Sequence, residues 1–338
     1  MSSPRQLLHS LIACSSLLGL GLTGCGHMNA KGAQAQWSPP SYYADEHYAE
    51  LAGVNTCYLE AGPPDAEETI VFVHGWSGNV QNWWDQFELF KSRYRVIAFD
   101  APGHGKSERG PHLDYSMHLH VEVLAALFEE LELEEAIVVG NSGGGWTAAN
   151  FAIEHPDKVS KLVLSDSTGS RTKGPAGAVL WMINAKWLEH SQVTSGEHYP
   201  GLDPKSRERQ EFAVSFDGTV EELPYLEALA QLLPPMYEVI PKQSLARIEA
   251  PTLIIWGDDD HVVPIRAMKA FDKGIPNSET YTVHLGGHTP MMNSPDEFNC
   301  AVASFLSGTD AAECAQYALD EELKRERLAG KDVGPHYH

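Results

Sequence analysis

Short apolar runs alternate with longer amphipathic stretches between about residue 47 and residue 307. Each run is three or four residues long and ends at polar or turn residues, which is the pattern of a buried strand. The six runs are Ile70–Val73, Val96–Phe99, Ala136–Val139, Leu162–Leu164, Thr252–Ile255 and Thr280–Val283. The stretches between them carry apolar residues at helical spacing. Strands that alternate with helices predict an α/β fold with a mostly parallel sheet flanked by helices.

The alternation stops between about residues 170 and 246. This segment is too long for a simple loop, and it is rich in aromatic side chains: Trp181, Trp187, Tyr199, Phe212, Phe216, Tyr225 and Tyr237. We expect residues 170–246 to form a helical cap, inserted between the two parts of the core, residues 47–169 and 247–307. The last part, residues 308–338, is expected to be a charged helix and a tail.

The N-terminal residues have the pattern of an export signal. Arg5 precedes an apolar run that ends at Leu22, and small residues follow. The four residues that end at Cys25 read Leu-Thr-Gly-Cys, which resembles the lipobox of bacterial lipoproteins. The resemblance implies that residues 1–24 are removed, that Cys25 receives acyl chains such as palmitate, and that residues 25–46 form a flexible tether.

Two alternatives remain open at this end of the chain. Cys14 follows Leu-Ile-Ala, a competing match, although its apolar run is only about seven residues long, at the lower limit for a signal peptide. The second alternative is that the segment is an uncleaved signal anchor, or that it is cleaved nearby as an ordinary signal peptide. The lipoprotein interpretation predicts a protein of the bacterial cell envelope, attached to a membrane through Cys25. Gly26 follows the lipid cysteine in place of aspartate, which favours the outer membrane by the same resemblance.

The composition is that of a globular protein, with 43% hydrophobic and 21% charged residues. The formal net charge of −22 disfavours binding to nucleic acid, and nothing in the sequence indicates a protein partner. In an oxidising compartment one disulfide is plausible, and Cys300 and Cys314 are the nearest pair. Neither the cysteines nor His118 and His120 have the pattern of metal ligands, so we expect no metal and no organic cofactor.

The residues from Gly140 to Gly144 read Gly-Asn-Ser-Gly-Gly and lie between a predicted strand and a predicted helix. The pattern Gly-x-Ser-x-Gly in this place is typical of a nucleophile elbow. A sharp turn holds the serine in a strained conformation, and the glycines prevent a clash between strand and helix. The N-terminus of the helix favours negative charge near the serine oxygen. The motif predicts that Ser142 is a nucleophile.

Two further motifs follow earlier strands. His74-Gly75-Trp76 comes after the first, and residues 99–107, which read Phe-Asp-Ala-Pro-Gly-His-Gly-Lys-Ser, come after the second. With the elbow, these motifs resemble those of the α/β-hydrolase superfamily, and the resemblance covers residues 47–307. It implies an α/β-hydrolase fold with an inserted helical cap.

The resemblance also assigns roles to residues around the nucleophile. The backbone N–H groups of Trp76 and Gly143 correspond to the oxyanion hole, which stabilises charge on the substrate carbonyl oxygen. Asp100 and His104, in the second motif, are expected to organise their turn and to take no part in catalysis.

A serine hydroxyl needs a base, and that base needs a carboxylate partner. By resemblance, the base is His288, after Gly-Gly and the last strand. The acid is Asp260, three residues after the glycine that ends the strand before; Asp166 is the competing acid. Asn293 stands where many relatives carry an acid. The order Ser142, Asp260, His288 matches the family.

These residues imply acyl transfer through an acyl-enzyme on a small-molecule substrate. A serine in the elbow disfavours epoxide opening and halide displacement, since relatives with those activities use aspartate there. Hydrolysis of a carboxylic ester, thioester or lactone with an apolar portion is the main hypothesis. Hydrolysis of a carbon–carbon bond next to a ketone is the alternative within the same fold. A binding protein that keeps the fold without turnover is a third hypothesis, which retention of all three residues disfavours.

Overall fold

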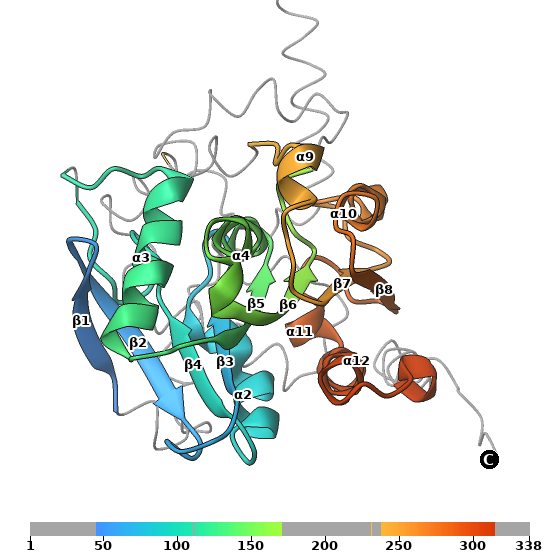
Figure 1. Cartoon of the computed structure of the whole chain (residues 1–338), viewed down its shortest axis with the longest axis horizontal. Helices are drawn as coiled ribbons and strands as arrows, with labels where there is room; N and C mark the ends of the chain where they lie inside the picture. The colour runs from blue at the N-terminus through green and yellow to red at the C-terminus, as the bar shows by residue number, and fades with distance from the viewer. Residues whose placement is uncertain (1–44, 111, 171–230, 232–237, 315–338) are drawn as a thin grey trace, which may run out of the picture.

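The computed structural model describes residues 45–110, 112–170, 231 and 238–314 (Figure 1). Eight strands form one sheet: β1 (His47–Leu51), β2 (Val54–Ala61), β3 (Thr69–Val73), β4 (Arg95–Phe99), β5 (Ala136–Asn141), β6 (Val159–Ser165), β7 (Thr252–Gly257) and β8 (Ser278–Val283). Each of the six predicted apolar runs lies within one of the strands from β3 to β8. Within the described residues the fold class predicted from the sequence is therefore confirmed.

The order of the strands in the sheet is β1-β2-β4-β3-β5-β6-β7-β8. The pairings from β4 through to β8 are parallel, whereas β1 pairs with β2 and β2 with β4 in antiparallel fashion. Parallel strands end at the same edge of a sheet, and ligands in such folds bind at that edge. The loops after β3, β5, β6, β7 and β8 therefore lie near one another.

The hairpin β1–β2 was not predicted. Its turn is made by Ala52 and Gly53, which both have positive φ values of 48° and 79°. Positive φ at both central residues is the geometry that a two-residue hairpin needs, and only Gly53 marked it in the sequence. The apolar pattern of the hairpin is weak because one face of β1 is exposed.

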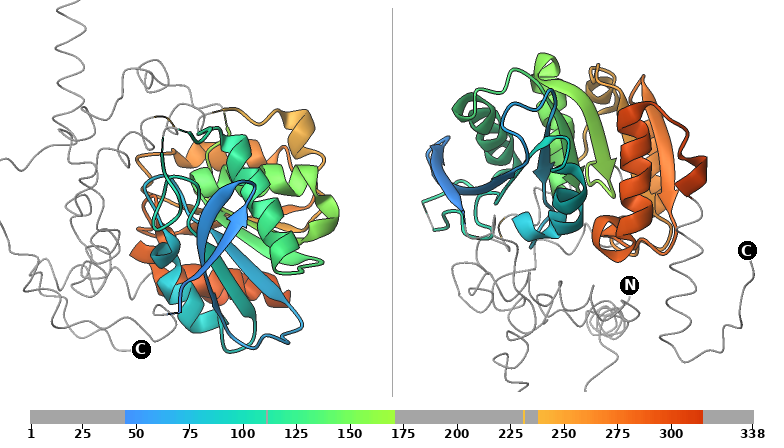
Figure 2. Two further views of the ribbon diagram at one scale, coloured as in Figure 1. Left: turned by 90° about the vertical axis from the view of Figure 1, so that its left-hand side faces the viewer. Right: turned by 90° about the horizontal axis from the view of Figure 1, so that it is seen from below.

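Helices cover both faces of the sheet (Figures 1 and 2). The α-helices are α2 (Trp84–Phe90), α3 (Met117–Glu130), α4 (Gly143–Glu154), α9 (Lys242–Leu245), α10 (Met268–Asp272), α11 (Pro290–Asn293) and α12 (Pro295–Ser307). Short 3-10 helices are η3 (Val80–Trp83), η4 (Pro156–Lys158), η8 (Ile265–Ala267) and η9 (Ala311–Cys314). Ser116 caps α3 by accepting a hydrogen bond from the backbone of Leu119, and Gly308 ends α12 in the left-handed conformation.

The core has two layers because successive side chains of a strand point to opposite faces. In β3, Val71 and Val73 belong to the layer under α3, α4 and α10, whereas Ile70 and Phe72 belong to the layer under α2 and α12. The central strands are buried on both faces, which is why they read as continuous apolar runs rather than as alternating patterns.

Several predictions fall on residues that the structure does not describe. These are the signal segment with Cys25, the tether, nearly all of the cap and most of the C-terminal tail. No helix among the described residues is long and apolar enough to cross a membrane. Cys300 and Cys314 are joined by a disulfide that ties α12 to η9, as the sequence suggested.

Candidate active site

Ser142 lies in a sharp turn between β5 and α4, with φ 54° and ψ −117°. A side chain at Gly140 would lie 2.3 Å from the carbonyl oxygen of Gly144, and one at Gly144 would lie 2.2 Å from that of Val73. Both positions therefore require glycine, since no Cβ atom fits at those distances. The turn has the strained geometry expected of a nucleophile elbow.

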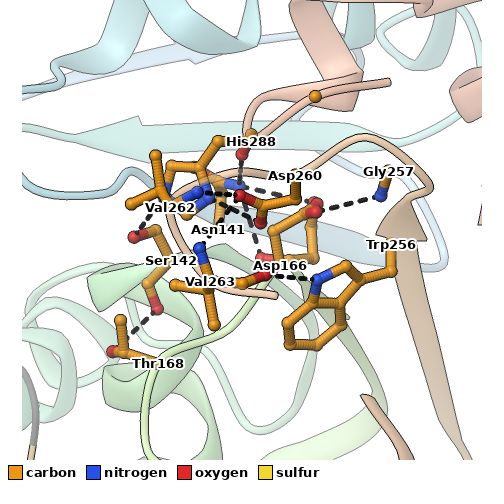
Figure 3. A network of polar contacts seen from close by, with 12 residues as sticks. Asn141, Ser142, Asp166, Thr168, Trp256, Gly257, Asp260, Val262, Val263 and His288 are labelled. Carbon is orange, nitrogen blue, oxygen red and sulfur yellow. Dashed lines mark hydrogen bonds and ion pairs between the residues drawn. The ribbon is translucent and has the colours of Figure 1, made fainter. Parts of the chain in front are cut away.

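Ser142, His288 and Asp260 form a chain of hydrogen bonds (Figure 3). The Ser142 hydroxyl lies 2.9 Å from His288 Nε2, and His288 Nδ1 lies 2.9 Å from Asp260 Oδ2. The ring therefore donates from Nδ1 to the carboxylate and accepts the hydroxyl proton at Nε2. The Asp260 side chain is fully buried, and that of His288 is 13% exposed. The structure thus brings together the three residues that the sequence analysis selected.

Three aspartates follow β7, and only Asp260 contacts His288. Its other oxygen, Oδ1, accepts hydrogen bonds from the backbone N–H groups of Val262 and Val263, at 2.7 and 2.9 Å. These two bonds fix the carboxylate in the turn, so that Oδ2 points toward the imidazole. Asp258 and Asp259 accept hydrogen bonds from the backbone of Leu285 and Gly287, at 2.8 and 2.6 Å.

The loop that carries His288 is therefore braced by the loop after β7. Asn293 adds a hydrogen bond of 2.9 Å from its side-chain amide to the carbonyl of Gly286. A carboxylate cannot donate such a bond, so the asparagine at this position supports the turn in a way that an acid would not. Leu285 and Gly287 have positive φ values of 53° and 59°, which shows how tightly the loop turns before the histidine.

Asn141 is a site residue that the sequence analysis did not single out. Its side-chain amide donates to the backbone carbonyl of His288 at 3.1 Å and to that of Ser165 at 3.3 Å. It is buried, and it links the elbow directly to the histidine loop. The signal in the sequence was present, because Asn141 is the variable residue of the elbow motif, but its partners are 24 and 147 positions away.

A small pocket lies beside Ser142, at the start of α4. Its lining residues are His74, Gly75, Trp76, Ala101, His104, Met117, His120, Gly143 and Gly144. The two residues predicted to supply the oxyanion hole, Trp76 and Gly143, therefore lie on the wall of one pocket. A side chain at Gly75 would lie 2.9 Å from Ser142 Cβ, so this glycine lets the loop after β3 pack directly against the nucleophile.

Burial keeps the three histidines of this pocket neutral. It lowers the pKa of His74 to about 4 and that of His120 to about 3, and the pKa of His104 lies well below the ordinary value for the same reason. His74 Nε2 accepts a hydrogen bond from the backbone of Ala101 at 2.9 Å. Among the described residues that line the pocket, none carries a formal charge at neutral pH.

Asp100 organises the turn after β4, as predicted. Its carboxylate accepts hydrogen bonds from the backbone of Val80 and Lys106, both at 2.8 Å. His104 donates from Nδ1 to the carbonyl of Pro102 at 3.1 Å and packs in the buried turn.

Asp166, the competing acid, lies close to the triad. One ligand-type atom each from Asp166, Asp260 and His288 lie within 4.8 Å of one another. Such a group has the residue types of a metal site. Here both ring nitrogens of His288 and both carboxyl groups already take part in hydrogen bonds within the protein, which accounts for the cluster.

The profile of the family described as alpha/beta hydrolase fold matches residues 68–201 and 205–295. The chain belongs to the α/β-hydrolase family. A 2-hydroxy-6-oxononadienedioate/2-hydroxy-6-oxononatrienedioate hydrolase of Cupriavidus pinatubonensis is 31% identical over 258 residues, which cover 71% of this chain and 86% of that protein.

Solved structures of this family share the fold. A meta-cleavage product hydrolase from Pseudomonas fluorescens has a TM-score of 0.59 at 23% identity and covers 78% of this chain and 97% of its own. A thermophilic esterase from Thermogutta terrifontis has a TM-score of 0.65 at 22% identity, and the match covers 78% of this chain and 98% of the esterase. At 22–23% sequence identity, the similarity to these two structures shows a shared fold and nothing further.

Proposed function

We propose that this α/β hydrolase acts through Ser142 as nucleophile, with His288 as general base and Asp260 as the carboxylate that orients it. The observation that carries the proposal is the position of His288, whose ring nitrogens lie 2.9 Å from the serine hydroxyl and 2.9 Å from the carboxylate. The backbone N–H groups of Trp76 and Gly143 form the oxyanion hole in this proposal.

The reaction proceeds in two steps. His288 Nε2 takes the proton of Ser142 as the oxygen attacks a carbonyl carbon, and the oxyanion hole stabilises the negative charge on the carbonyl oxygen, which is worth about 3 kcal/mol for each donor. His288 then returns the proton to the leaving group, and an acyl-enzyme remains. Water that is deprotonated by the same histidine releases the acid and restores Ser142.

The first candidate for the bond that the enzyme hydrolyses is a carbon–carbon bond next to a ketone. The relative from Cupriavidus pinatubonensis supports it, because the substrate in its name carries a ketone and two carboxylates but no ester. Attack of the serine on the ketone breaks the bond to the neighbouring carbon. The electron pair leaves with that carbon, which takes its proton from His288, and the acyl group stays on the serine.

Hydrolysis of a carboxylic ester, thioester or lactone is the second candidate. The residues beside the proposed oxyanion hole support it, because Trp76 and Met117 are uncharged and suit the neutral carbonyl portion of such a substrate.

One experiment separates the two candidates. Residues 26–338, without the lipid cysteine, are assayed with nitrophenyl esters of two to twelve carbons and with 2-hydroxy-6-oxo dienoates that carry one or two carboxylates; Ser142→Ala is the control. Turnover of the dienoates well above that of the esters supports the first candidate, and the reverse supports the second. Failure of a fluorophosphonate to label Ser142 would overturn the serine mechanism and favour a non-catalytic binding protein.

We further propose that the protein is exported and held at a bacterial membrane by acyl chains on Cys25. The pattern of the first 25 residues supports this proposal, and the disulfide between Cys300 and Cys314 is in keeping with an oxidising compartment. An alkyne analogue of palmitate should label the wild type and the Cys14→Ala variant but not Cys25→Ala. Loss of the label in Cys14→Ala alone would assign the anchor to Cys14 instead.

A further inference from the structure

Two buried carboxyl groups lie side by side next to His288. Asp166 follows β6 directly and is 0% exposed, and the Asp260 side chain is 0% exposed as well. One carboxyl oxygen of each group lies within 4.8 Å of the other, and Figure 3 shows the two side chains close to each other and to His288. Two ionised carboxylates at this separation would repel each other without solvent to screen them. A single proton on one of the two carboxyl groups would remove this repulsion.

The hydrogen bonds around the pair assign that proton. Asp260 accepts three N–H donors, two from the backbone and one from His288, and each of them stabilises the ionised form. Asp166 accepts one backbone N–H, from Gly257 at 2.9 Å, and the hydroxyl of Ser165 at 2.9 Å. The negative charge is consequently better supported on Asp260, and the proton belongs to Asp166.

We propose that Asp166 is a positioning residue that stays protonated at neutral pH and donates a hydrogen bond to the ionised Asp260, so that this carboxylate is held against His288. The proposal rests on the proposed function, in which Asp260 orients the general base. Burial, and next the negative charge of Asp260, raise the pKa of Asp166 well above its usual range, in the same direction as the geometry.

Other charged groups nearby have different partners. Asp258 is bonded to His284 and to the backbone of Leu285, and Asp259 is bonded to the backbone of Gly287. Among the described residues, Asp260 is the charge that acts on Asp166, and His288 adds a positive charge only while it is protonated.

The backbone at Asp166 determines which variants are informative. Its φ is 46°, in the left-handed region, where aspartate and asparagine are tolerated better than alanine. Asp166→Asn keeps the shape of the protonated acid, its neutrality and its ability to donate to Asp260. Asp166→Ala removes the donor, and Asp260→Asn removes the charge that the donor serves.

The first test compares kcat, KM and the pH profile of these three variants on the best substrate. Asp260→Asn should lower kcat about 10⁴-fold. Asp166→Asn should retain kcat within about tenfold, and Asp166→Ala should lose about 10- to 100-fold, the size of one hydrogen bond to a charged group, with KM little changed. In Asp166→Ala alone, the acid limb of the kcat/KM profile should move to higher pH, since Asp260 then loses one hydrogen-bond donor and its negative charge acts more strongly on His288.

The second test needs no substrate. An aspartate that is protonated in the native state costs stability as the pH rises above its unfolded pKa of about 3.9, because the unfolded chain releases the proton. The stability of Asp166→Asn relative to the wild type, measured by urea unfolding, should therefore increase from pH 4 to pH 8. Infrared difference spectra at pH 7 should show a protonated carboxyl band in the wild type that Asp166→Asn lacks.

Three results would overturn the proposal. These are a loss in Asp166→Asn as large as that in Asp260→Asn, a relative stability of Asp166→Asn that does not change with pH, and equal kcat and acid limbs in Asp166→Ala and Asp166→Asn. A wild type that turns over no substrate would count against the proposed function, whereas the stability series and the infrared band would still test Asp166.

Discussion

Acidification from pH 8 to pH 5 should destabilise this protein through the histidines of the pocket beside Ser142. His74, His104 and His120 are buried, and burial lowers the pKa of each in the folded state. The unfolded chain takes up protons near pH 6.5, whereas the folded chain does so only at lower pH. The stability that these neutral histidines contribute is therefore fully present above about pH 6.5, and it is lost as the pH falls toward their folded pKa values.

The magnitude follows from the folded pKa values of about 4 for His74 and about 3 for His120. Both folded pKa values lie below pH 5, so the two histidines are still neutral in the folded protein at that pH. The loss in the free energy of unfolding therefore depends almost entirely on the pKa of histidine in the unfolded chain, and it amounts to about 2 kcal/mol for each histidine. His74 and His120 together give about 4 kcal/mol, close to the lower end of the total stability of many proteins, and the lowered pKa of His104 adds a loss in the same direction. Asp166 acts in the opposite direction over this range, so single variants are more informative than the wild type alone.

The assay is urea unfolding at pH 8 and at pH 5 for the wild type, His120→Phe and His47→Gln, the last as a control with an exposed ring. His120→Phe keeps a planar ring in α3 and removes the titrating group. The loss of stability between the two pH values should be about 2 kcal/mol smaller in His120→Phe than in the wild type. An equal loss in the two proteins would refute the inference that His120 is neutral in the folded state.

Three further predictions concern the nucleophile, the elbow and the disulfide. Ser142→Ala should lower kcat about 10⁶-fold and abolish labelling by a fluorophosphonate, with an unchanged circular dichroism spectrum. Gly144→Ala should destabilise by more than about 3 kcal/mol in urea unfolding, because its Cβ would lie 2.2 Å from a backbone oxygen of β3; Gly308→Ala, with positive φ but open space, should cost only about 1 kcal/mol. Replacing Cys300 and Cys314 by alanine should cost about 3 kcal/mol, and reducing agent should then have no further effect on stability.

Local patterns in the sequence were sufficient for the central strands and for the nucleophile. The strands from β3 to β7 are largely buried on both faces, so their central residues form continuous apolar runs that can be recognised without knowledge of their neighbours. In the edge strand β8 only Val283 is buried. The elbow was recognisable because it requires glycine at fixed sequence positions around the serine, which makes a short motif. The contact that requires Gly144, with the carbonyl of Val73 in β3, is made only in the fold. The hairpin β1–β2 escaped because an edge strand with one exposed face has no continuous apolar run.

The tertiary structure decided how the acids divide their roles. Asp166 follows β6, and Asp260 is one of three aspartates after β7. The sequence alone does not distinguish a carboxylate that accepts three N–H groups from one that keeps a proton. The same holds for Asn141, whose partner His288 lies 147 residues away. Hydrogen bonding and burial arise from parts of the chain that meet only on folding. The sequence therefore determined which residues are present at the sheet edge, and the fold determined their charge states and contacts.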